Sequence, residues 1–367
     1  MAINSGDIIG QVLSQQGVQF LFTLCGGHIS PILLGAKKAG IRVVDVRDEV
    51  NAVFAADAVG RITGVPGVAA VTAGPGVTNS LTALKNAQMA QAPLILLGGA
   101  APTVLKNRGA LQDIDQLSLL KSIAKMAITI TRNCDVVPVV EKAFDVCRSG
   151  VPGPVFIECP IDILYNESLV RQWYGAKPDA ERKSGMRSKL LDFYLQRHVD
   201  QMFACEFEDM KPGGYKVVSP DFASRSVSKA LELVAMSQRP VLIVGSQATL
   251  QPDNIDKLAG AVGSLVIPTY LTGMARGLLG RSHPMQMRHQ RKKALQKADL
   301  VIIAGMPCDF RLNYGRSIGS GARIMEVNRS KTDLKLNCRP DLAVHSDPFL
   351  FLCSLADAFV PEPSAWE

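Results

Sequence analysis

Glu49 is the acidic residue of this chain whose position best suits chemistry. It follows the apolar run Val43-Val44, which predicts a buried strand, and it precedes a predicted helix whose inner face is mostly alanine. Ligands of open α/β sheets gather beyond the carboxyl ends of the strands, so this carboxylate lies where a ligand would bind. A solvated turn charge, or a first-turn helix acid favoured by the helix dipole, explains the position equally well. The spacing alone leaves both interpretations open.

Two glycine turns are predicted at the same edge of the sheet. Gly74-Pro75-Gly76 breaks the strand predicted over residues 67–72, and Asn79 lies just inside the helix that follows. Cys25-Gly26-Gly27-His28 ends the preceding strand, and two adjacent glycines allow the backbone to approach a ligand closely. His28 is either a satisfied polar residue at a helix start or an acid–base or substrate-contacting group.

Strands and helices alternate through the chain and are joined by short turns, which is typical of parallel sheets with helices packed on them. In the first half, strand runs are predicted at residues 18–23, 43–44, 67–72 and 94–97. In the second half, strand runs are predicted at residues 240–245, 266–269, 300–305 and 323–328. Apolar residues at helical spacing occupy segments between these runs.

This pattern predicts an α/β protein with two doubly wound parallel-sheet domains. The first domain is expected over residues 1–165 and the second over residues 221–360. Between them, residues 166–220 are polar and rich in Lys and Arg, which is typical of a linker, and they carry one predicted helix around residues 190–203. At 367 residues, the chain is long enough for two or three domains.

Composition and charge argue against several classes of function. Hydrophobic residues make up 47% and charged residues 20% of the sequence, which is ordinary for a globular protein. With 6% aromatic residues and no recognition motif, nothing indicates nucleic-acid binding. No apolar run reaches the roughly 18 to 20 residues of a membrane span, and neither a secretory leader nor a peroxisomal tripeptide is found. We therefore expect a soluble, intracellular, cytoplasmic chain.

The eight cysteines are spread singly through the sequence and form no CxxC pair. In an intracellular protein, such cysteines are expected to remain reduced and to be mostly buried. The sequence therefore predicts free thiols.

The region around Glu49 resembles the pyrimidine-binding domain of thiamine-diphosphate enzymes related to acetolactate synthase. The shared signature is an acid at a strand end followed by Ala-Ala-Asp-Ala, Arg-x-Thr-Gly and Gly-Val-Ala-Ala-Val-Thr-x-Gly-Pro-Gly-x-Thr-Asn. Segments 26–31, 86–91, 107–112 and 273–280 resemble the animal 2-hydroxyacyl-CoA lyases of this family in particular. The resemblance covers nearly the full chain.

The resemblance implies that thiamine diphosphate is the cofactor and that Glu49 hydrogen-bonds its pyrimidine N1′. In that family this bond favours the imino tautomer, which removes the C2 proton of the thiazolium ring, while the protein supplies orientation and electrostatics. His28 and Gln112 are implied as further catalytic residues. The implied cofactor contacts, besides Glu49, are Gly26, Gly27, Thr72, Gly74, Pro75 and Asn79.

The reaction implied by the resemblance is the C–C lyase step of fatty-acid α-oxidation, which cleaves a 2-hydroxyacyl-CoA into formyl-CoA and an aldehyde. One alternative is an acetolactate synthase-type carboligase acting on a 2-oxo acid. Another is a non-catalytic assembly or regulatory chain that pairs with a full-length enzyme. Because the family's active site forms between subunits, a homodimer or homotetramer is implied. The animal relatives are anchored to the endoplasmic reticulum by an N-terminal segment that is not found here.

The Mg²⁺-binding signature of the family, Gly-Asp-Gly or Gly-Asp-Ser followed by an Asn-Asn pair, is not found in this sequence. Hard cations need such oxygen ligands. We therefore expect no metal ligands in this chain, with Mg²⁺ and the diphosphate held elsewhere. The chain alone is expected to bind the cofactor poorly and to catalyse little.

The second predicted domain resembles the Rossmann-like central domain of the family, which holds FAD or an ADP-like group. Gly245 ends a strand in a geometry that suits a pyrophosphate. The other candidate nucleotide contacts are Arg276, Asp309 and Arg311. Flavin binding is doubtful because Pro307-Cys308 replaces part of the family's motif, and the absent GxGxxG argues against a dinucleotide oxidoreductase. The basic cluster at residues 288–293 is either a solvated helix face or a contact for a coenzyme A phosphate.

Overall fold

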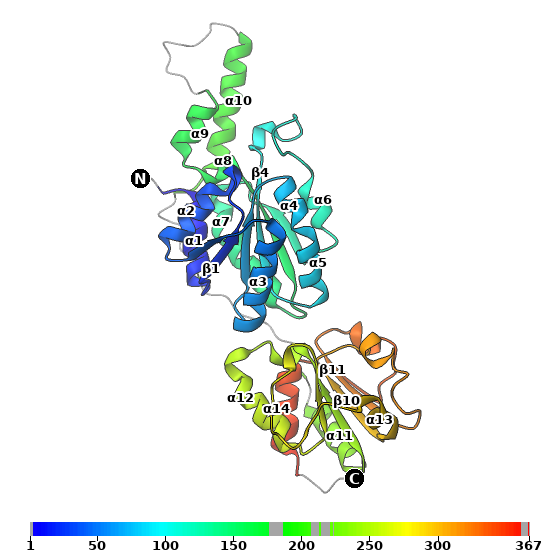
Figure 1. Ribbon diagram of the computed structural model, residues 1–367. Coiled ribbons are helices and arrows are strands. Elements are labelled where there is room, and N and C mark those ends of the chain that lie inside the picture. Colours follow the sequence, from blue (N-terminus) through cyan, green and yellow to red (C-terminus); the bar gives the residue numbers. More distant parts are fainter. Residues whose placement is uncertain are drawn as a thin grey trace. The chain divides into compact units, whose positions relative to one another are not determined.

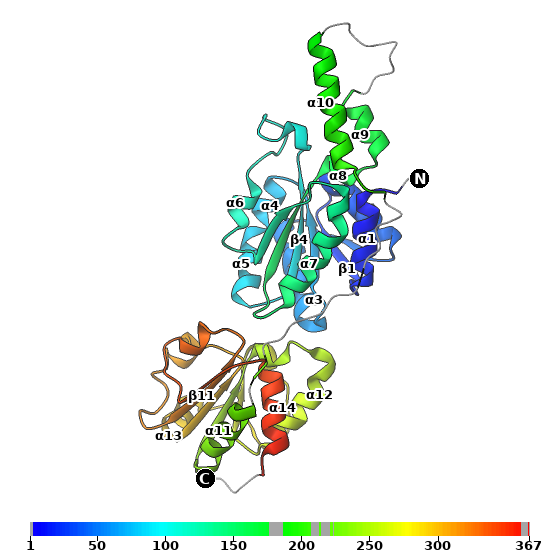
Figure 2. The ribbon, with the colours of Figure 1, turned by 180° about the vertical axis from the view of Figure 1, so that it is seen from behind.

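The apolar runs of the sequence form two separate six-stranded sheets, and each sheet has helices on both faces (Figures 1 and 2). The computed structural model describes residues 3–175, 186–206, 213, 221–222, 224–360 and 366. The chain divides into two units, Met1–Val217 and Val218–Glu367. All strand pairs found among the described residues are parallel, which confirms the predicted fold class.

The sheet of the first unit has the strand order β2-β1-β3-β4-β6-β5. Its strands are β1 (Phe20–Thr23), β2 (Arg42–Asp45), β3 (Gly67–Val71), β4 (Leu94–Ala100), β5 (Met126–Thr129) and β6 (Pro154–Pro160). The strands β3, β4 and β6 are buried throughout, as expected for parallel strands covered on both faces. Our prediction of a buried strand before Glu49 is wrong, because β2 lies at the sheet edge and is partly exposed.

Alternate residues of these strands enter different cores. Val68 and Ala70 pack with one set of helices, whereas Ala69 and Val71 pack with the other. The helices of the first core are α1 (Ser5–Gln15), α2 (Ser30–Lys38), α7 (Val136–Arg148), α8 (Ile161–Leu164), α9 (Glu167–Trp173) and α10 (Met186–Met202). Those of the second are α3 (Glu49–Thr63), α4 (Pro75–Asn79), α5 (Leu81–Met89) and α6 (Gln116–Leu120).

Part of the segment predicted as a linker packs on the first unit. Helices α9 and α10 lie side by side (Figure 2) and add Val170, Val199 and Met202 to its core. A disulfide joins Cys134, before α7, to Cys205, after α10. The prediction of free thiols is therefore wrong for this pair, because local spacing carries no signal for a contact across 71 residues.

The second unit has the strand order β12-β11-β10-β7-β8-β9. Its strands are β7 (Pro240–Val244), β8 (Thr269–Leu271), β9 (Gln286–Met287), β10 (Leu300–Ala304), β11 (Arg323–Asn328) and β12 (Leu342–His345). Its helices are α11 (Ser224–Ala235), α12 (Ile255–Ser264), α13 (Arg291–Lys297) and α14 (Pro348–Ala358). The strand predicted at residues 266–269 begins only at Thr269, because Val266 adopts a left-handed φ of 50° and Pro268 has no N–H to donate.

None of the helices among the described residues combines the length and apolarity that crossing a bilayer requires.

Candidate functional site

Glu49 is the first residue of α3, directly after Asp48, whose side chain caps the helix. Its side chain turns inward and only 7% of Glu49 is exposed. Its Oε2 atom accepts a hydrogen bond of 3.1 Å from Asn79 Nδ2. The interpretation of Glu49 as a solvated turn charge therefore fails, although the helix dipole still favours an acid at this place.

Glycines allow the segments around Glu49 to approach one another. A Cβ atom on Gly26 would lie 2.4 Å from Thr72 Cβ, which is closer than real Cβ contacts allow. A Cβ atom on Gly76 would lie 3.0 Å from Thr72 Cγ2 and 3.4 Å from Glu49 Oε1. The carboxyl ends of β1 and β3 and the start of α3 thus form one glycine-lined edge that holds a buried carboxylate.

His28 and Gly27 lie at the end of β1. The Nδ1 atom of His28 is 3.2 Å from Thr72 Oγ1, and its Cβ atom packs against Gly99. A Cβ atom on Gly27 would meet no atom of the described residues within 4 Å, so among them this glycine makes no close contact. Of the residues predicted around this turn, the structure therefore brings His28 and Gly26 against Thr72.

Gln112 lies in the segment of residues 101–115, which we name the Gln112 loop. The loop contains left-handed residues, and Gln112 itself has φ 62°. Non-glycine residues in this conformation are concentrated at functional sites. Gly74, with φ 62°, has its Cα so close to the loop that a Cβ atom would lie 2.8 Å from the Gln112 carbonyl oxygen. The loop carrying Gln112 and the turn after β3 are therefore in direct contact.

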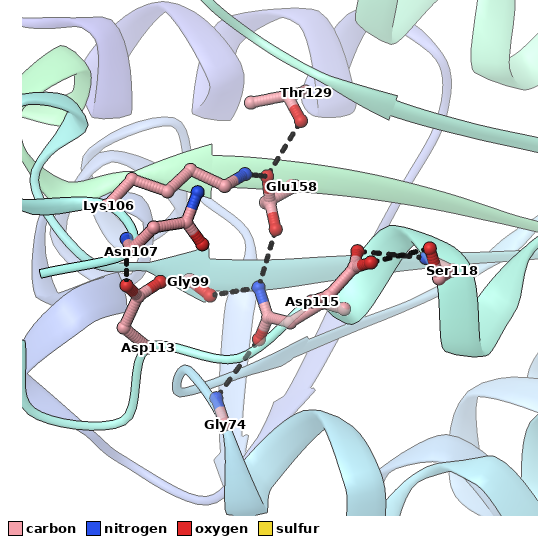
Figure 3. A network of polar contacts seen from close by, with 10 residues as sticks. Gly74, Gly99, Lys106, Asn107, Asp113, Asp115, Ser118, Thr129 and Glu158 are labelled. Atoms are coloured by element: carbon pink, nitrogen blue, oxygen red, sulfur yellow. Dashed lines mark hydrogen bonds and ion pairs between the residues drawn. The ribbon is translucent and has the colours of Figure 1, made fainter. Parts of the chain in front are cut away.

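A cavity of about 260 Å³ lies between the Gln112 loop and the ends of β4, β5 and β6. Its polar wall includes Lys106, Gln112, Gln116, Thr129 and Glu158. Figure 3 shows the polar contacts on this wall. Of these five residues only Gln112 was predicted as a site candidate from the sequence, and the other four, Lys106, Gln116, Thr129 and Glu158, were missed. The acid within the apolar run of β6 was the one available signal.

The predicted nucleotide contacts of the second unit do not all meet. Arg276 lines a cavity of about 470 Å³ together with Arg288 and Arg291. Asp309 and Arg311 bind each other, with Arg311 Nη2 donating to Asp309 Oδ2 at 2.8 Å, and neither lines this cavity. Gly245 also lies outside its lining and approaches the backbone of residue 305.

In the part of the chain that the structure describes, no group of three or more His, Cys, Asp or Glu residues is arranged to hold a metal ion.

Replacing Asn79 with alanine should lower the free energy of unfolding by about 1–3 kcal/mol, because the buried Glu49 carboxylate would lose its donor. Urea unfolding measures the change. Asn51→Ala is the matched control, since Asn51 is an exposed residue of the same helix α3. If the cost of Asn79→Ala were equally large in a Glu49→Ala background, the two side chains would not be coupled.

His28 should make the protein less stable in acid. Burial lowers the pKa of His28 below its usual 6.5. Between these two pKa values the unfolded chain binds a proton that the folded chain does not, so stability is lost as the pH falls through this window. NMR titration of the His28 ring, assigned with His28→Asn, measures the pKa. A ring pKa at or above 6.5 would contradict the expectation.

Each of the two units contains a segment that matches a domain of a known family. Residues 3–119 match the family described as thiamine pyrophosphate enzyme, N-terminal TPP binding domain, and residues 227–355 match its central domain. The chain is 46% identical over 359 residues to 2-hydroxyacyl-CoA lyase 2 of Homo sapiens, covering 96% of this chain and 56% of that protein. For the protein of the same name from Danio rerio, the identity is 47% over 359 residues, or 97% of this chain and 57% of the relative.

A more distant relative is a probable acetolactate synthase of Mycobacterium bovis, which is 32% identical over 327 residues. That alignment covers 89% of this chain and 53% of the relative. The chain therefore spans little more than half the length of the curated relatives it matches.

Proposed function

Because this chain belongs to the thiamine pyrophosphate enzyme family, we propose that its first unit binds the pyrimidine end of thiamine diphosphate at the glycine-lined edge around Glu49. The observation that carries the proposal is the buried carboxylate. One oxygen of Glu49 is held by Asn79, and among the described residues no hydrogen bond to the other, Oε1, is found. That oxygen borders the narrow space beside Gly76 and Thr72. The edge of a flat ring fits this space better than a side chain does, and a ring nitrogen there can hydrogen-bond Oε1.

The residues of this edge fit such a cofactor. When bound, thiamine diphosphate supplies a carbon nucleophile that attacks carbonyl groups. Glu49 holds a proton at the pyrimidine N1′, and Asn79 fixes the orientation of its carboxylate. His28 remains neutral near pH 7, because burial lowers its pKa, and can exchange a proton with a substrate oxygen. The backbone of Gly26, Gly27, Gly74 and Pro75, together with Thr72, forms the walls.

The reaction we assign is cleavage of a 2-hydroxyacyl-CoA to formyl-CoA and an aldehyde, with Gln112 facing the substrate. This assignment is supported by the higher identity to 2-hydroxyacyl-CoA lyase 2, 46–47%, than to acetolactate synthase, 32%. The alternative supported by the more distant relative is a carboligase that condenses 2-oxo acids. In either case Mg²⁺ and the diphosphate are assigned to ligands outside the described residues, within a homodimer or homotetramer.

In the second unit, the arginine-lined cavity is assigned to an anionic nucleotide group. Arg276, Arg288 and Arg291 line this cavity with guanidinium groups. A guanidinium group can donate two parallel hydrogen bonds to two oxygens of one phosphate. The ADP-like part of coenzyme A fits this charge, and FAD is the second candidate. Lys292 and Lys293 are exposed on α13, as expected of a solvated helix face.

The test uses the protein that contains this chain, supplied with thiamine diphosphate and Mg²⁺. One reaction contains a 2-hydroxyacyl-CoA and the other pyruvate, and mass spectrometry identifies the products. Formyl-CoA with a shortened aldehyde is the expected result. Acetolactate alone would overturn the lyase assignment in favour of the carboligase. No product from either substrate, with stimulation of an added full-length relative, would overturn it in favour of an assembly role.

A further inference from the structure

Gln116, the first residue of α6, is a buried amide whose side chain joins three segments of the first unit. Only 2% of the residue is exposed. Its Oε1 atom accepts a 3.0 Å hydrogen bond from the Gly74 N–H. Its Nε2 atom donates to the Gly99 carbonyl at 3.1 Å and to Glu158 Oε1 at 2.9 Å. One side chain thus connects the turn after β3 with the carboxyl ends of β4 and β6.

Glu158 extends this connection to the Gln112 loop. The residue is 1% exposed and its Oε2 atom accepts from Lys106 Nζ at 3.0 Å and from Thr129 Oγ1 at 2.7 Å. In Figure 3, Lys106 and Thr129 approach one oxygen of the Glu158 carboxylate. The other oxygen faces the Gln116 amide, which also contacts Gly99 and Gly74. A buried charge is costly unless it is paired and hydrogen-bonded. Glu158 therefore holds Lys106 against β6, and with it the first half of the Gln112 loop.

The two ends of this network are the two sides of the proposed active site. Gly74 begins the turn that leads into α4, and α4 ends at Asn79, the hydrogen-bond donor to Glu49. Lys106 lies six residues before Gln112 on the same loop. Gln116 and Glu158 are about as buried as the surrounding core, and neither belongs to the glycine-lined edge itself. Both line the cavity beside the Gln112 loop, and they act on the glycine-lined edge through the segments that they hold.

We propose that Gln116 and Glu158 are positioning residues that tie the substrate-facing Gln112 loop to the cofactor-facing turn at Gly74. This inference rests on the proposed function of the Glu49 edge. The ion pair between Glu158 and Lys106 fixes the position of the Gln112 loop. The amide of Gln116 couples that position to the turn at Gly74, because it binds both Glu158 and the Gly74 N–H. A displacement of about 1 Å in such a site can cost on the order of 100-fold in rate.

The first test replaces Gln116 with methionine, which has similar volume and no hydrogen-bonding amide. Hydrogen exchange followed by mass spectrometry should show faster exchange at the Gly74 N–H and in the Gln112 loop. In the protein containing this chain, kcat should fall about tenfold or more. Ser118→Ala is the matched control, because it removes a contact to Asp115 on the same helix outside the network. It should leave both the Gly74 exchange and kcat unchanged.

The second test replaces Gln116 with glutamate, which keeps the acceptor for Gly74 but puts a carboxylate against Glu158. Two facing carboxyl groups raise one pKa strongly, so the pair shares a proton below that raised pKa and loses it above. The kcat of Gln116→Glu should therefore recover as the pH falls, with a limb in its pH profile that the wild type lacks. A change in packing alone would produce no such limb.

The third test is the double substitution Lys106→Met with Glu158→Gln. Because it removes both charges together, it leaves no unpaired charge buried, and the protein should still fold. The Gln112 loop nevertheless loses its ion pair, so kcat/KM for the acyl-CoA should be lower than in the wild type. Unchanged exchange and kcat in Gln116→Met, with kcat/KM still lowered about 100-fold or more by Glu49→Gln, would overturn the positioning role and leave the proposed function intact. Unchanged turnover in Glu49→Gln as well would mean that the proposed function itself has failed.

Discussion

Glu49→Gln should lower kcat/KM about 100-fold or more while changing the free energy of unfolding little. General acid–base groups contribute on the order of 10² to 10⁴ in rate, and the amide cannot exchange a proton with the pyrimidine nitrogen. Glutamine keeps the size of the side chain and an oxygen that can accept from Asn79. Steady-state turnover, urea unfolding and calorimetric titration with thiamine diphosphate together measure the effect. Glu49→Ala should be equally inactive and also less stable.

The matched control for this prediction is Asp48→Asn. Asp48 precedes Glu49 in the chain, is exposed, and caps α3 by accepting from the Val50 N–H. Asparagine caps a helix about as well as aspartate, so this variant removes a neighbouring charge without disturbing the helix start. Turnover should remain within a few-fold of wild type. Rates like those of the wild type from Glu49→Gln or Glu49→Ala would refute the role of Glu49.

Glu326→Gln should remove a large pH dependence of stability in the second unit. Glu326 lies on β11 and is fully buried, and within the described part of the chain its Oε1 atom has no hydrogen-bond partner. The Cys338 thiol lies 3.2 Å from its Oε2 atom. Desolvation, with smaller contributions from Cys338 and Asp333, raises the pKa of Glu326 from 4.5 to about 9. The folded chain therefore holds this carboxyl group neutral at pH 7.

The direction of the effect follows from proton linkage. Between pH 4.5 and about 9 the folded chain keeps a proton that the unfolded chain has lost. The stability contributed by this group is thus fully present below pH 4.5 and is lost as the pH rises through about 9. One proton corresponds to at most about 1.4 kcal/mol per pH unit. The glutamine variant should lack this slope and be more stable than wild type at pH 8.

Tryptophan fluorescence can isolate the second unit for this measurement. The sequence contains two tryptophans, and Trp366 packs in the same core cluster as Cys338 and Ile324. Urea unfolding in a Trp173→Phe background, at several pH values, therefore reports on the surroundings of Glu326. Glu232→Gln, at an exposed position of α11, is the control for removing a carboxylate. If the pH slope persisted unchanged in Glu326→Gln, the buried carboxyl would not be its source.

The elements of this protein are predictable from its sequence because their signals are local. Runs of apolar residues such as 67–72 and 300–305 need burial on both faces, and they form the central strands β3 and β10. The parallel arrangement then brings Gly26, Thr72 and Glu49 to one edge of one sheet, since the carboxyl ends of parallel strands share an edge. The strand prediction failed at Val266 and Pro268, although both are apolar. Val266 has a left-handed backbone conformation, and Pro268 has no N–H to donate to a neighbouring strand.

The partners of the polar side chains were decided only by the tertiary structure. Asn79 meets Glu49 across 30 residues, Gln116 meets Glu158 across 42, and Cys134 meets Cys205 across 71. No periodicity links such positions, because each contact depends on the register of strands and the placement of loops between them. The sequence by itself thus determined the two sheets and the sheet edge at which we propose that the cofactor binds. The folded chain decided which buried groups hold that edge in place.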